Sequence, residues 1–237
     1  MQSVTISLFR FNSLAARLWV LGQMALARPA LAQLTGLQAF KLCGSGTGEG
    51  FTPRPNWGVW AIVAVWDDDS HAREAQATAR IFRGWRHRAA EAWTLHLEPY
   101  QSRGRWAQAE PFAPHGTSGQ GPILVLTRAS VRLSRIMAFW RRVPDISARI
   151  GANTDVLFKI GIGEVPFAHQ VTVSIWPDAD RLSAFAHHGP HAQAIKAVRQ
   201  GQWFAEELYA RFRVSGSEGT WGGRDPLSGF EMKGLAA

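Results

Sequence analysis

Apolar and polar residues alternate along two similar stretches of the chain, residues 3–11 and 121–128. A period of two predicts strands that bury one face. An amphipathic helix is expected after each strand, because Leu14, Leu18 and Leu21 share one helical face in the first half. Two further strands and then helical sequence follow in both halves: 37–43, 57–66 and 68–89, and 155–163, 167–176 and 178–209. A short final strand is expected to end each half.

The two halves share sequence as well as pattern. Ser7-Leu8-Phe9-Arg10 has a counterpart in Val125-Leu126-Thr127-Arg128, and Phe40-Lys41-Leu42 has one in Phe158-Lys159-Ile160. Matches that recur in the same order along a chain indicate an internal duplication.

The repeated order of strand, helix, two strands, helix and strand is that of a ferredoxin-like unit. Its sheet carries helices on one face only, so the other face needs a cover. We therefore predict an α+β protein built from tandem duplicated ferredoxin-like (βαββαβ) units, residues 1–118 and 119–237. The two halves are expected to form one structural unit, a single-chain pseudo-dimeric α/β barrel.

Composition excludes several classes of protein. The 237 residues are 46% hydrophobic, too apolar for a disordered chain, and the single cysteine forms no intrachain disulfide. The longest apolar run, Trp57–Trp66, is about half of the roughly 20 residues that a spanning helix needs. The apolar stretch 18–27 resembles a secretory signal, but its counterpart in the second half lies mid-chain. We expect a cytoplasmic protein.

The formal charge of +8 is divided evenly between the halves, so no basic arm is predicted. A basic chain with 11 tryptophans fits stacking on single-stranded nucleic acid. These tryptophans, however, occupy core-like positions, and no RNA-binding or zinc-finger motif is present. We expect no nucleic-acid partner, whereas peripheral contact with an anionic membrane surface fits the charge.

The glycine-rich segment, residues 43–50, resembles a phosphate-binding loop only superficially. It lacks the Gly-Lys-Ser/Thr ending of a P-loop, and Glu49 stands at the third glycine position of the dinucleotide fingerprint. The segment is better interpreted as a loop that joins two strands and covers a pocket. Its Cys43 is either a thiolate ligand of iron or a small core residue.

Histidines distinguish the second half from the first. His169 shares a strand face with Val171, and we expect that face to pack under the helices. His191 follows Gly189-Pro190 at a helix start and leads an apolar stripe that points toward the sheet. The two predict a haem site in the second half, with His191 as the axial iron ligand and His188 as the alternative. Buried histidines bonded to backbone carbonyls are the other interpretation.

Lysines recur in the middle of two strands. Lys41 and Lys159 each need a buried anion, which is either a haem propionate or a glutamate. The predicted cofactor-binding residues are thus His191, His169 and Lys159. The remaining histidines are expected on the surface: His71, His87, His96 and His115.

The opposite strand face is expected to line the barrel interior. It is apolar and aromatic in the first half and more polar in the second. Such a cavity suits a long hydrophobic ligand with few polar anchors, although ordinary barrel packing explains the pattern equally well. The predicted cavity residues are Trp60, Ile62, Trp66, Gln170, Thr172 and Trp176. No catalytic side chain is singled out.

Three segments of the chain are long and distinctive: residues 41–51 (KLCGSGTGEGF), 158–164 (FKIGIGE) and 203–212 (WFAEELYARF). With these segments the chain resembles the spheroidene monooxygenase family, the acyclic carotenoid 2-ketolases of purple photosynthetic bacteria. The resemblance covers nearly the whole chain. It implies a haem-containing oxygenase, soluble or peripheral to the photosynthetic membrane.

The same resemblance implies a reaction in carotenoid biosynthesis. Dioxygen and reduced ferredoxin would serve two oxygen insertions at the 2-position of spheroidene or spirilloxanthin, and loss of water from the gem-diol would leave the ketone. Two alternatives use the same fold: a cofactor-free monooxygenase of the dimeric α/β-barrel type, and a non-enzymatic carotenoid or haem carrier.

Overall fold

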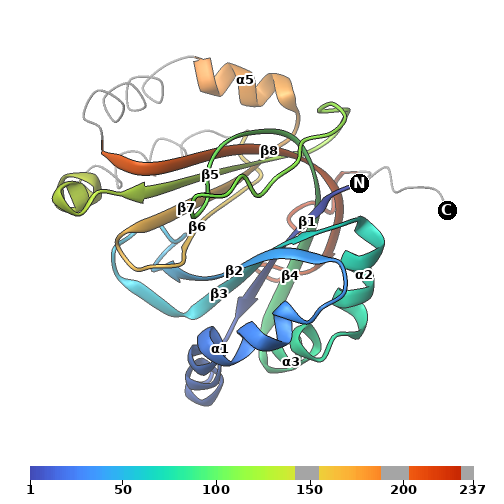
Figure 1. Cartoon of the computed structure of the whole chain (residues 1–237), viewed down its shortest axis with the longest axis vertical. Helices are drawn as coiled ribbons and strands as arrows, with labels where there is room; N and C mark the ends of the chain where they lie inside the picture. Colours follow the sequence, from blue (N-terminus) through green and yellow to red (C-terminus); the bar gives the residue numbers. More distant parts are fainter. Residues whose placement is uncertain (142–154, 188–202, 231–237) are drawn as a thin grey trace.

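Eight antiparallel strands close into one barrel in the computed structural model, which describes residues 1–141, 155–187 and 203–230 (Figure 1). The order around the barrel is β1-β3-β2-β6-β7-β5-β8-β4. The strands are β1 (Ser3–Arg10), β2 (Leu37–Gly46), β3 (Pro55–Trp66), β4 (Glu91–Gly104), β5 (Ile123–Val131), β6 (Phe158–Gly163), β7 (His169–Trp176) and β8 (Phe204–Gly219). The predicted antiparallel arrangement with helices outside the sheet is thus confirmed.

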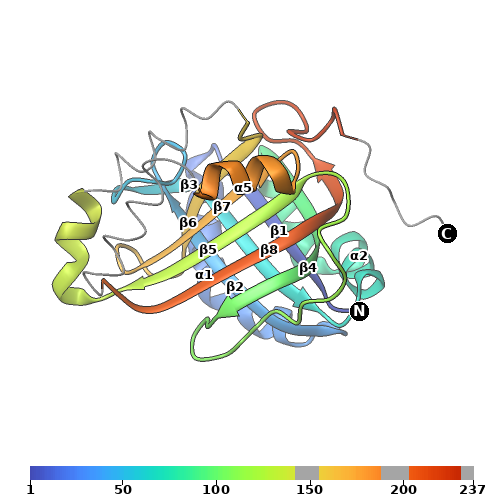
Figure 2. The same ribbon diagram turned by 90° about the horizontal axis from the view of Figure 1, so that it is seen from above.

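Helices pack against the outside of the barrel. In the first half, α1 (Leu14–Ala32), α2 (Asp69–Thr78) and α3 (Arg80–Arg88) cover one side (Figure 1). In the second half, the 3-10 turn η1 (Leu133–Arg135) follows β5, and α5 (Ala179–His187) lies on the opposite side of the barrel. Figure 2 shows the strands crossing obliquely beneath α5.

Residues 204–209 correct the prediction of helical sequence over 178–209. They begin β8, in which Leu208, Ala210 and Phe212 are buried at every second position. These side chains belong to the barrel core, together with those of the first half. Burial of every second side chain in this core therefore outweighs the helix propensity of Glu206 and Glu207 at the start of the segment. Residues 188–202 lie outside the described part of the chain.

On β3 and β7, the face predicted to pack under the helices lies inside the barrel, and the face predicted to line the interior lies outside. Val59 and Val63 of β3 belong to the barrel core, whereas Trp60 and Trp66 pack under α1, α2 and α3. His169 lies on the face of β7 that contains Val171, and that face also turns toward the barrel core. The predicted placement of the Trp60 face inside the barrel is wrong. Both faces of β3 are buried and apolar, so the alternation along this strand did not identify the inner face.

Two strand pairs join the halves, and they differ greatly in length. β4 and β8 form eleven residue pairs, from Trp93↔Gly219 to Gly104↔Leu208. β2 and β6 form two pairs only, Gly44↔Gly163 and Ser45↔Ile162. We call these junctions the long seam and the short seam.

Candidate functional site

The glycine-rich segment bridges the short seam. Ser45 Oγ donates a hydrogen bond of 2.7 Å to the Gly161 carbonyl, and Gly161 N–H donates one of 2.7 Å to the Glu49 carbonyl. Gly50 has φ +90°, and a Cβ built on it would lie 1.9 Å from the Gly161 oxygen. Only glycine allows two backbones to approach this closely. The segment is therefore a structural clasp between the halves, not a phosphate-binding loop.

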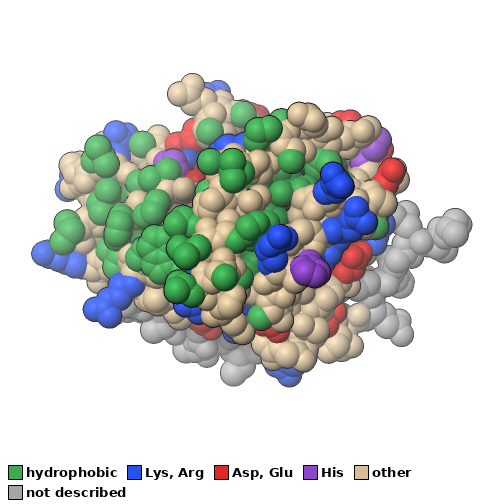
Figure 3. All heavy atoms as spheres, turned by 90° about the horizontal axis from the view of Figure 1, so that it is seen from below, with side chains coloured by type: hydrophobic (Ala, Val, Ile, Leu, Met, Phe, Trp, Pro, Cys, Tyr) green, Lys and Arg blue, Asp and Glu red, His purple; other side chains and the backbone are tan. Residues whose placement is uncertain are grey.

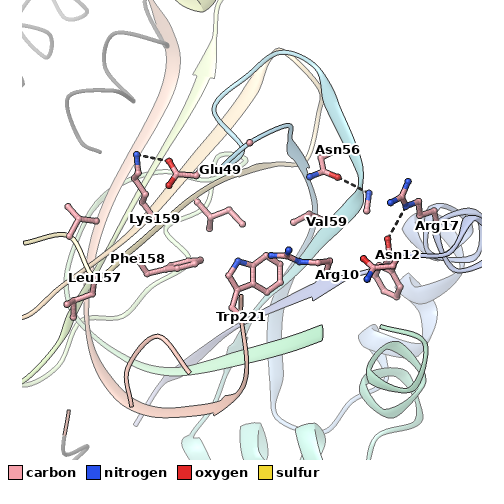
Figure 4. A pocket seen from close by; sticks show the side chains of 15 residues that line it. Arg10, Asn12, Arg17, Glu49, Asn56, Val59, Leu157, Phe158, Lys159 and Trp221 are labelled. Atoms are coloured by element: carbon pink, nitrogen blue, oxygen red, sulfur yellow. Dashed lines mark hydrogen bonds and ion pairs between the residues drawn. The ribbon is translucent and has the colours of Figure 1, made fainter. Parts of the chain in front are cut away.

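A polar cavity of about 540 Å³ opens on one side of this clasp. Figure 4 shows Arg10 against Trp221 near its middle, and Lys159 paired with Glu49 at its edge. The Arg10 guanidinium lies 4.6 Å from the Trp221 ring centroid, and Lys159 Nζ lies 2.7 Å from a Glu49 carboxylate oxygen. Lys159 therefore has a glutamate as its partner, which is one of the two anions expected for it.

An ionic cluster occupies the barrel wall beyond the end of β6. Lys41 Nζ lies 3.4 Å from one Glu164 carboxylate oxygen, and Trp106 Nε1 donates a hydrogen bond of 2.6 Å to the other. His169 Nδ1 lies 3.8 Å from that second oxygen and has no hydrogen-bond partner among the described residues. Lys41, like Lys159, is thus paired with a glutamate.

A second ion pair completes the cluster. The buried Arg128 contacts the Glu206 carboxylate, which also accepts hydrogen bonds from the backbone N–H groups of Ala107 (2.9 Å) and Gln108 (2.7 Å). Ala107 and Gln108 adopt positive φ angles of 54° and 67°, so the turn after β4 presents two adjacent donors. These donors and Arg128 hold the pKa of Glu206 below its usual value, although its partial burial opposes them.

Burial controls the ionisation of two further groups. It lowers the pKa of His169, assisted by Arg128 and opposed by Glu164 and Glu206. The neutral imidazole, which is the form that binds metals, is therefore favoured. Burial also raises the pKa of Cys43, and Glu164 adds to the effect. Cys43 lies in the barrel core as a protonated thiol, which favours the core interpretation over an iron-bound thiolate.

An apolar cavity of about 320 Å³ adjoins the short seam. Its walls come from α1, from β2 and β3, and from the loop between β6 and β7. His169, Gln170, Glu164 and Ser45 are among its few polar side chains. The aromatic and large aliphatic lining consists of Leu21, Met24, Leu42, Trp57, Trp60, Trp140, Ile162, Val165 and Phe167. An apolar wall with a few polar groups is typical of a site for a hydrophobic ligand.

The predicted cavity residues are separated by the structure. Trp60 and Gln170 line the apolar cavity, and His169 lies beside them. Ile62 and Trp66 instead pack under the helices of the first half. In the second half, Trp176 is buried against Leu182 of α5.

Thr172 is half-buried in β7 and belongs to the lining of neither cavity. The predicted cofactor residues are divided as well, since Lys159 lines the polar cavity and His169 the apolar one. His188 and His191 lie outside the described residues. Within residues 1–141, 155–187 and 203–230, no group of three or more His, Cys, Asp or Glu side chains is placed to hold a metal ion.

His96 corrects the prediction of a surface histidine. It is completely buried on β4, with Nδ1 3.5 Å from an Asp69 oxygen and Nε2 3.1 Å from a Glu218 oxygen. Its neighbours Leu95 and Leu97 are also buried, so both faces of this part of β4 are covered. The leucines on either side of His96 in the sequence were the signal that could have predicted its burial. The contact with Glu218 of β8 crosses the long seam, whereas Asp69 belongs to α2 of the first half.

Comparison with known proteins gives three curated relatives, all named spheroidene monooxygenase. The protein of Rhodobacter capsulatus is 48% identical over 96% of both chains. That of Cereibacter sphaeroides is 51% identical over 96% of this chain and 71% of its own length, and that of Rubrivivax gelatinosus is 31% identical over 89% and 81%. None of the protein-family models searched matches the chain.

Among solved structures, the fold is similar to that of aldoxime dehydratase. The complex of aldoxime dehydratase OxdRE with butyraldoxime has a TM-score of 0.60 at 11% identity, covering 90% of this chain and 79% of that chain. A second aldoxime dehydratase structure has a TM-score of 0.59 at 11% identity, covering 90% and 81%. At this identity the likeness shows the fold alone.

Fold and site together define a closed antiparallel barrel protein with an apolar ligand cavity beside a small ionic cluster. The curated relatives make the assignment specific. The chain belongs to the spheroidene monooxygenase family, and it is an oxidoreductase of the monooxygenase type.

Proposed function

We propose that this monooxygenase binds an acyclic carotenoid in the apolar cavity and introduces a keto group at its 2-position. Dioxygen and electrons from reduced ferredoxin would be consumed at a haem. The observation that carries the proposal is the apolar cavity at the short seam, in a chain 48–51% identical to two spheroidene monooxygenases. Spheroidene and spirilloxanthin are the proposed substrates, and carotenoid biosynthesis for photosynthesis is the proposed setting.

The size and lining of the cavity support a carotenoid end group as the bound part. About 320 Å³ is at the lower end of pockets that enclose a small ligand. A whole carotenoid is longer than such a pocket, so the rest of the polyene would extend through the open side. Trp57, Trp60 and Trp140 offer flat apolar surfaces against which a conjugated chain packs.

The reaction would proceed as two successive oxygen insertions at one carbon. Each insertion takes one oxygen atom from dioxygen into a C–H bond and reduces the other atom to water with two electrons and two protons. The resulting gem-diol loses water and leaves the ketone. In this scheme the protein binds the polyene, excludes water and fixes which carbon reacts.

The residues beside the apolar cavity are compatible with haem. His169 is neutral, and its buried Nδ1 has no hydrogen-bond partner within the described structure. His191, or His188 in its place, would hold the haem iron, and His169 would contact the cofactor. When bound, haem supplies the activation of dioxygen. Lys159 is assigned no role toward a propionate, since Glu49 is its partner.

The absorption spectrum of the purified protein tests the cofactor. We expect a Soret band that His191→Ala abolishes and His169→Ala shifts. An unchanged spectrum in His191→Ala would refute that ligand. A colourless protein that retains activity would identify a cofactor-free monooxygenase instead.

Product analysis tests the substrate site. Purified protein with spheroidene, dioxygen and reduced ferredoxin should yield the 2-ketone, and Trp60→Ala should raise KM roughly tenfold through lost aromatic contact. Trp221→Ala is the matched control, because Trp221 lines only the polar cavity and should leave KM unchanged. Carotenoid that is bound but unconverted would identify a carrier.

We also infer that the two halves arose by duplication of a ferredoxin-like unit, with boundaries at residues 1–118 and 119–237. The strand order supports this inference. Strands β4-β1-β3-β2 of the first half correspond in order to β8-β5-β7-β6 of the second. Separate expression of the two halves tests it: mixing them should restore the carotenoid activity, and two inactive, unassociated halves would argue against it.

A further inference from the structure

Helix α1 turns its leucine stripe toward solvent. Val20, Ala27 and Leu31 are its buried residues, and they lie on the face opposite the predicted stripe. Leu14 is 72% exposed and Leu18 62%, with Leu21 and Leu26 exposed beside them. A soluble helix normally buries such a stripe. On α1 this stripe is exposed, so apolar side chains lie on both sides of the helix.

The charges on α1 and α3 are of one sign. The only charged residues of α1 are Arg17 and Arg28, and the neighbouring helix α3 (RIFRGWRHR) also contains no acidic residue. Arg88 of α3 lies 4.5 Å above the ring of Trp19 in α1, so the two helices form one continuous surface. Figure 3 shows hydrophobic side chains gathered on the half of this face where α1 lies, with Lys and Arg at their edge, while the other half carries Lys and Arg together with His and acidic side chains.

The apolar part of the surface continues to the mouth of the apolar cavity. Leu21 and Met24 of α1 line that cavity. Trp57, which is 54% exposed, and Phe167, which is 46% exposed, also belong to its lining. Monomeric soluble proteins rarely expose a contiguous apolar patch of this kind without a partner.

We propose that α1 and α3 form a docking face for an anionic lipid bilayer, with the leucines of α1 inserted among the acyl chains and the arginines of α3 on the headgroups. We define this docking face by its exposed residues: Leu14, Leu18, Leu21, Leu26, Arg80, Arg83 and Arg88. Apolar insertion with flanking arginines is how interfacial helices bind membranes, and anionic headgroups complement the cations. The exposed Trp57 would lie at the level of the headgroups, where tryptophan is enriched in membrane proteins.

A second copy of the chain fits this face less well than lipid. A two-fold contact through α1 and α3 would place arginines opposite arginines with no carboxylate on either helix. None of the described helices has the length and apolarity that crossing a bilayer requires, so the contact is peripheral. That a carotenoid passes from the bilayer into the adjoining cavity rests on the proposed function, but the docking itself does not.

Vesicle co-sedimentation without any substrate tests the docking face separately from the enzymatic activity. Wild-type protein should bind phosphatidylcholine vesicles that contain phosphatidylglycerol, and bind weakly to phosphatidylcholine alone. Leu18→Asp should lower the partition coefficient at least roughly tenfold, and Arg83→Glu about fivefold or more. Arg181→Glu, on α5 at the opposite side of the barrel (Figure 1), is the matched control and should change it by less than about twofold.

Thermal melting of each variant shows whether it is folded, and Leu26→Asp repeats the test if Leu18→Asp does not fold. Three results would overturn the proposal. Wild-type protein that ignores anionic vesicles is the first, and binding that is equal in Leu18→Asp and wild type is the second. The third is a dimer by light scattering that Leu18→Asp dissociates, because the occupant would then be a second copy.

Discussion

The long seam and the short seam perform the same task, joining the halves, by different means. At the long seam, β4 and β8 share eleven residue pairs, and the buried His96 contacts carboxylates from α2 and β8. At the short seam, two residue pairs are supplemented by the clasp of Ser45, Glu49 and Gly50 against Gly161.

The difference explains where the cavities lie. Glu49 and Lys159 line the polar cavity, while Ser45 and Ile162 line the apolar one, so both cavities adjoin the short seam. A continuous ladder of hydrogen bonds fills the space between strands, whereas a ladder of two pairs leaves room on either side. Both candidate sites therefore lie at the short seam, and the long seam supplies the longer ladder between the halves.

Removing a large side chain from the core beside the long seam should have the largest effect on stability. Phe212 of β8 is fully buried and packs edge-to-face on Phe112 at 4.9 Å. Phe212→Ala should lower the free energy of unfolding by about 3–5 kcal/mol, measured by urea denaturation. Leu133→Ala, at a residue that is 84% exposed, should cost less than about 0.5 kcal/mol. A loss below about 1 kcal/mol for Phe212→Ala would contradict this assignment of the core.

The short seam should be broken by one methyl group. Gly50→Ala places a Cβ against the Gly161 carbonyl at a positive φ and should cost about 2–4 kcal/mol. Unlike Phe212→Ala, it should also weaken ligand binding in the apolar cavity, which Gly50 lines. Gly48→Ala is the matched control, with φ +66° and no atom within 4 Å, and should cost about 1 kcal/mol. Equal losses in the two variants would exclude the clasp.

Acid should weaken the packing of α2 on β4, beside the long seam, through Asp69. Its pKa is lowered from the usual 3.8 to about 2, mainly by its contact with His96. Because the pKa of Asp69 is lower in the folded protein than in the unfolded chain, its ionised form stabilises the fold at pH values above about 3.8. That stability is lost as the pH falls from about 3.8 toward 2. Denaturation at a series of pH values should show this loss in wild type and a flatter profile in Asp69→Asn. Parallel profiles would show that the His96 contact does not contribute.

The ion pair at the short seam should have the smallest effect. Glu49 is 57% exposed, and solvent screens its attraction to Lys159. A double-mutant cycle with Lys159→Gln and Glu49→Gln should give a coupling energy below about 1 kcal/mol. High salt should reduce that energy further. A coupling of several kcal/mol would mean that the clasp depends on charge more than on backbone contact.

Much of the fold was predictable from local pattern. The alternation at residues 3–11 and 121–128 and the helical periodicity of 68–89 correspond to β1, β5, α2 and α3. The helix expected over 204–209 was wrong, because Leu208 and Ala210 are fixed in β8 by strands distant in sequence.

The site was predictable only in part. Trp60, Gln170 and His169 were named from their positions on two strands, and they do line one cavity. The ionic partners of Lys41 and Lys159 were expected to be anions, but nothing local identifies Glu164 and Glu49. Those pairs form across the short seam, between segments more than a hundred residues apart in sequence.

The sequence by itself determined the strands, their period, the basic charge and the family. Only the tertiary structure decided which face of each strand is inside. Both faces of β3 are apolar because both are covered, one by the barrel and one by helices, so hydrophobicity does not distinguish Val59 from Trp60. The packing partners do: Val59 meets side chains of the other strands inside the barrel, and Trp60 meets side chains of the helices. The leucine stripe of α1 likewise lies outside, because the opposite face, with Val20 and Ala27, packs against the sheet.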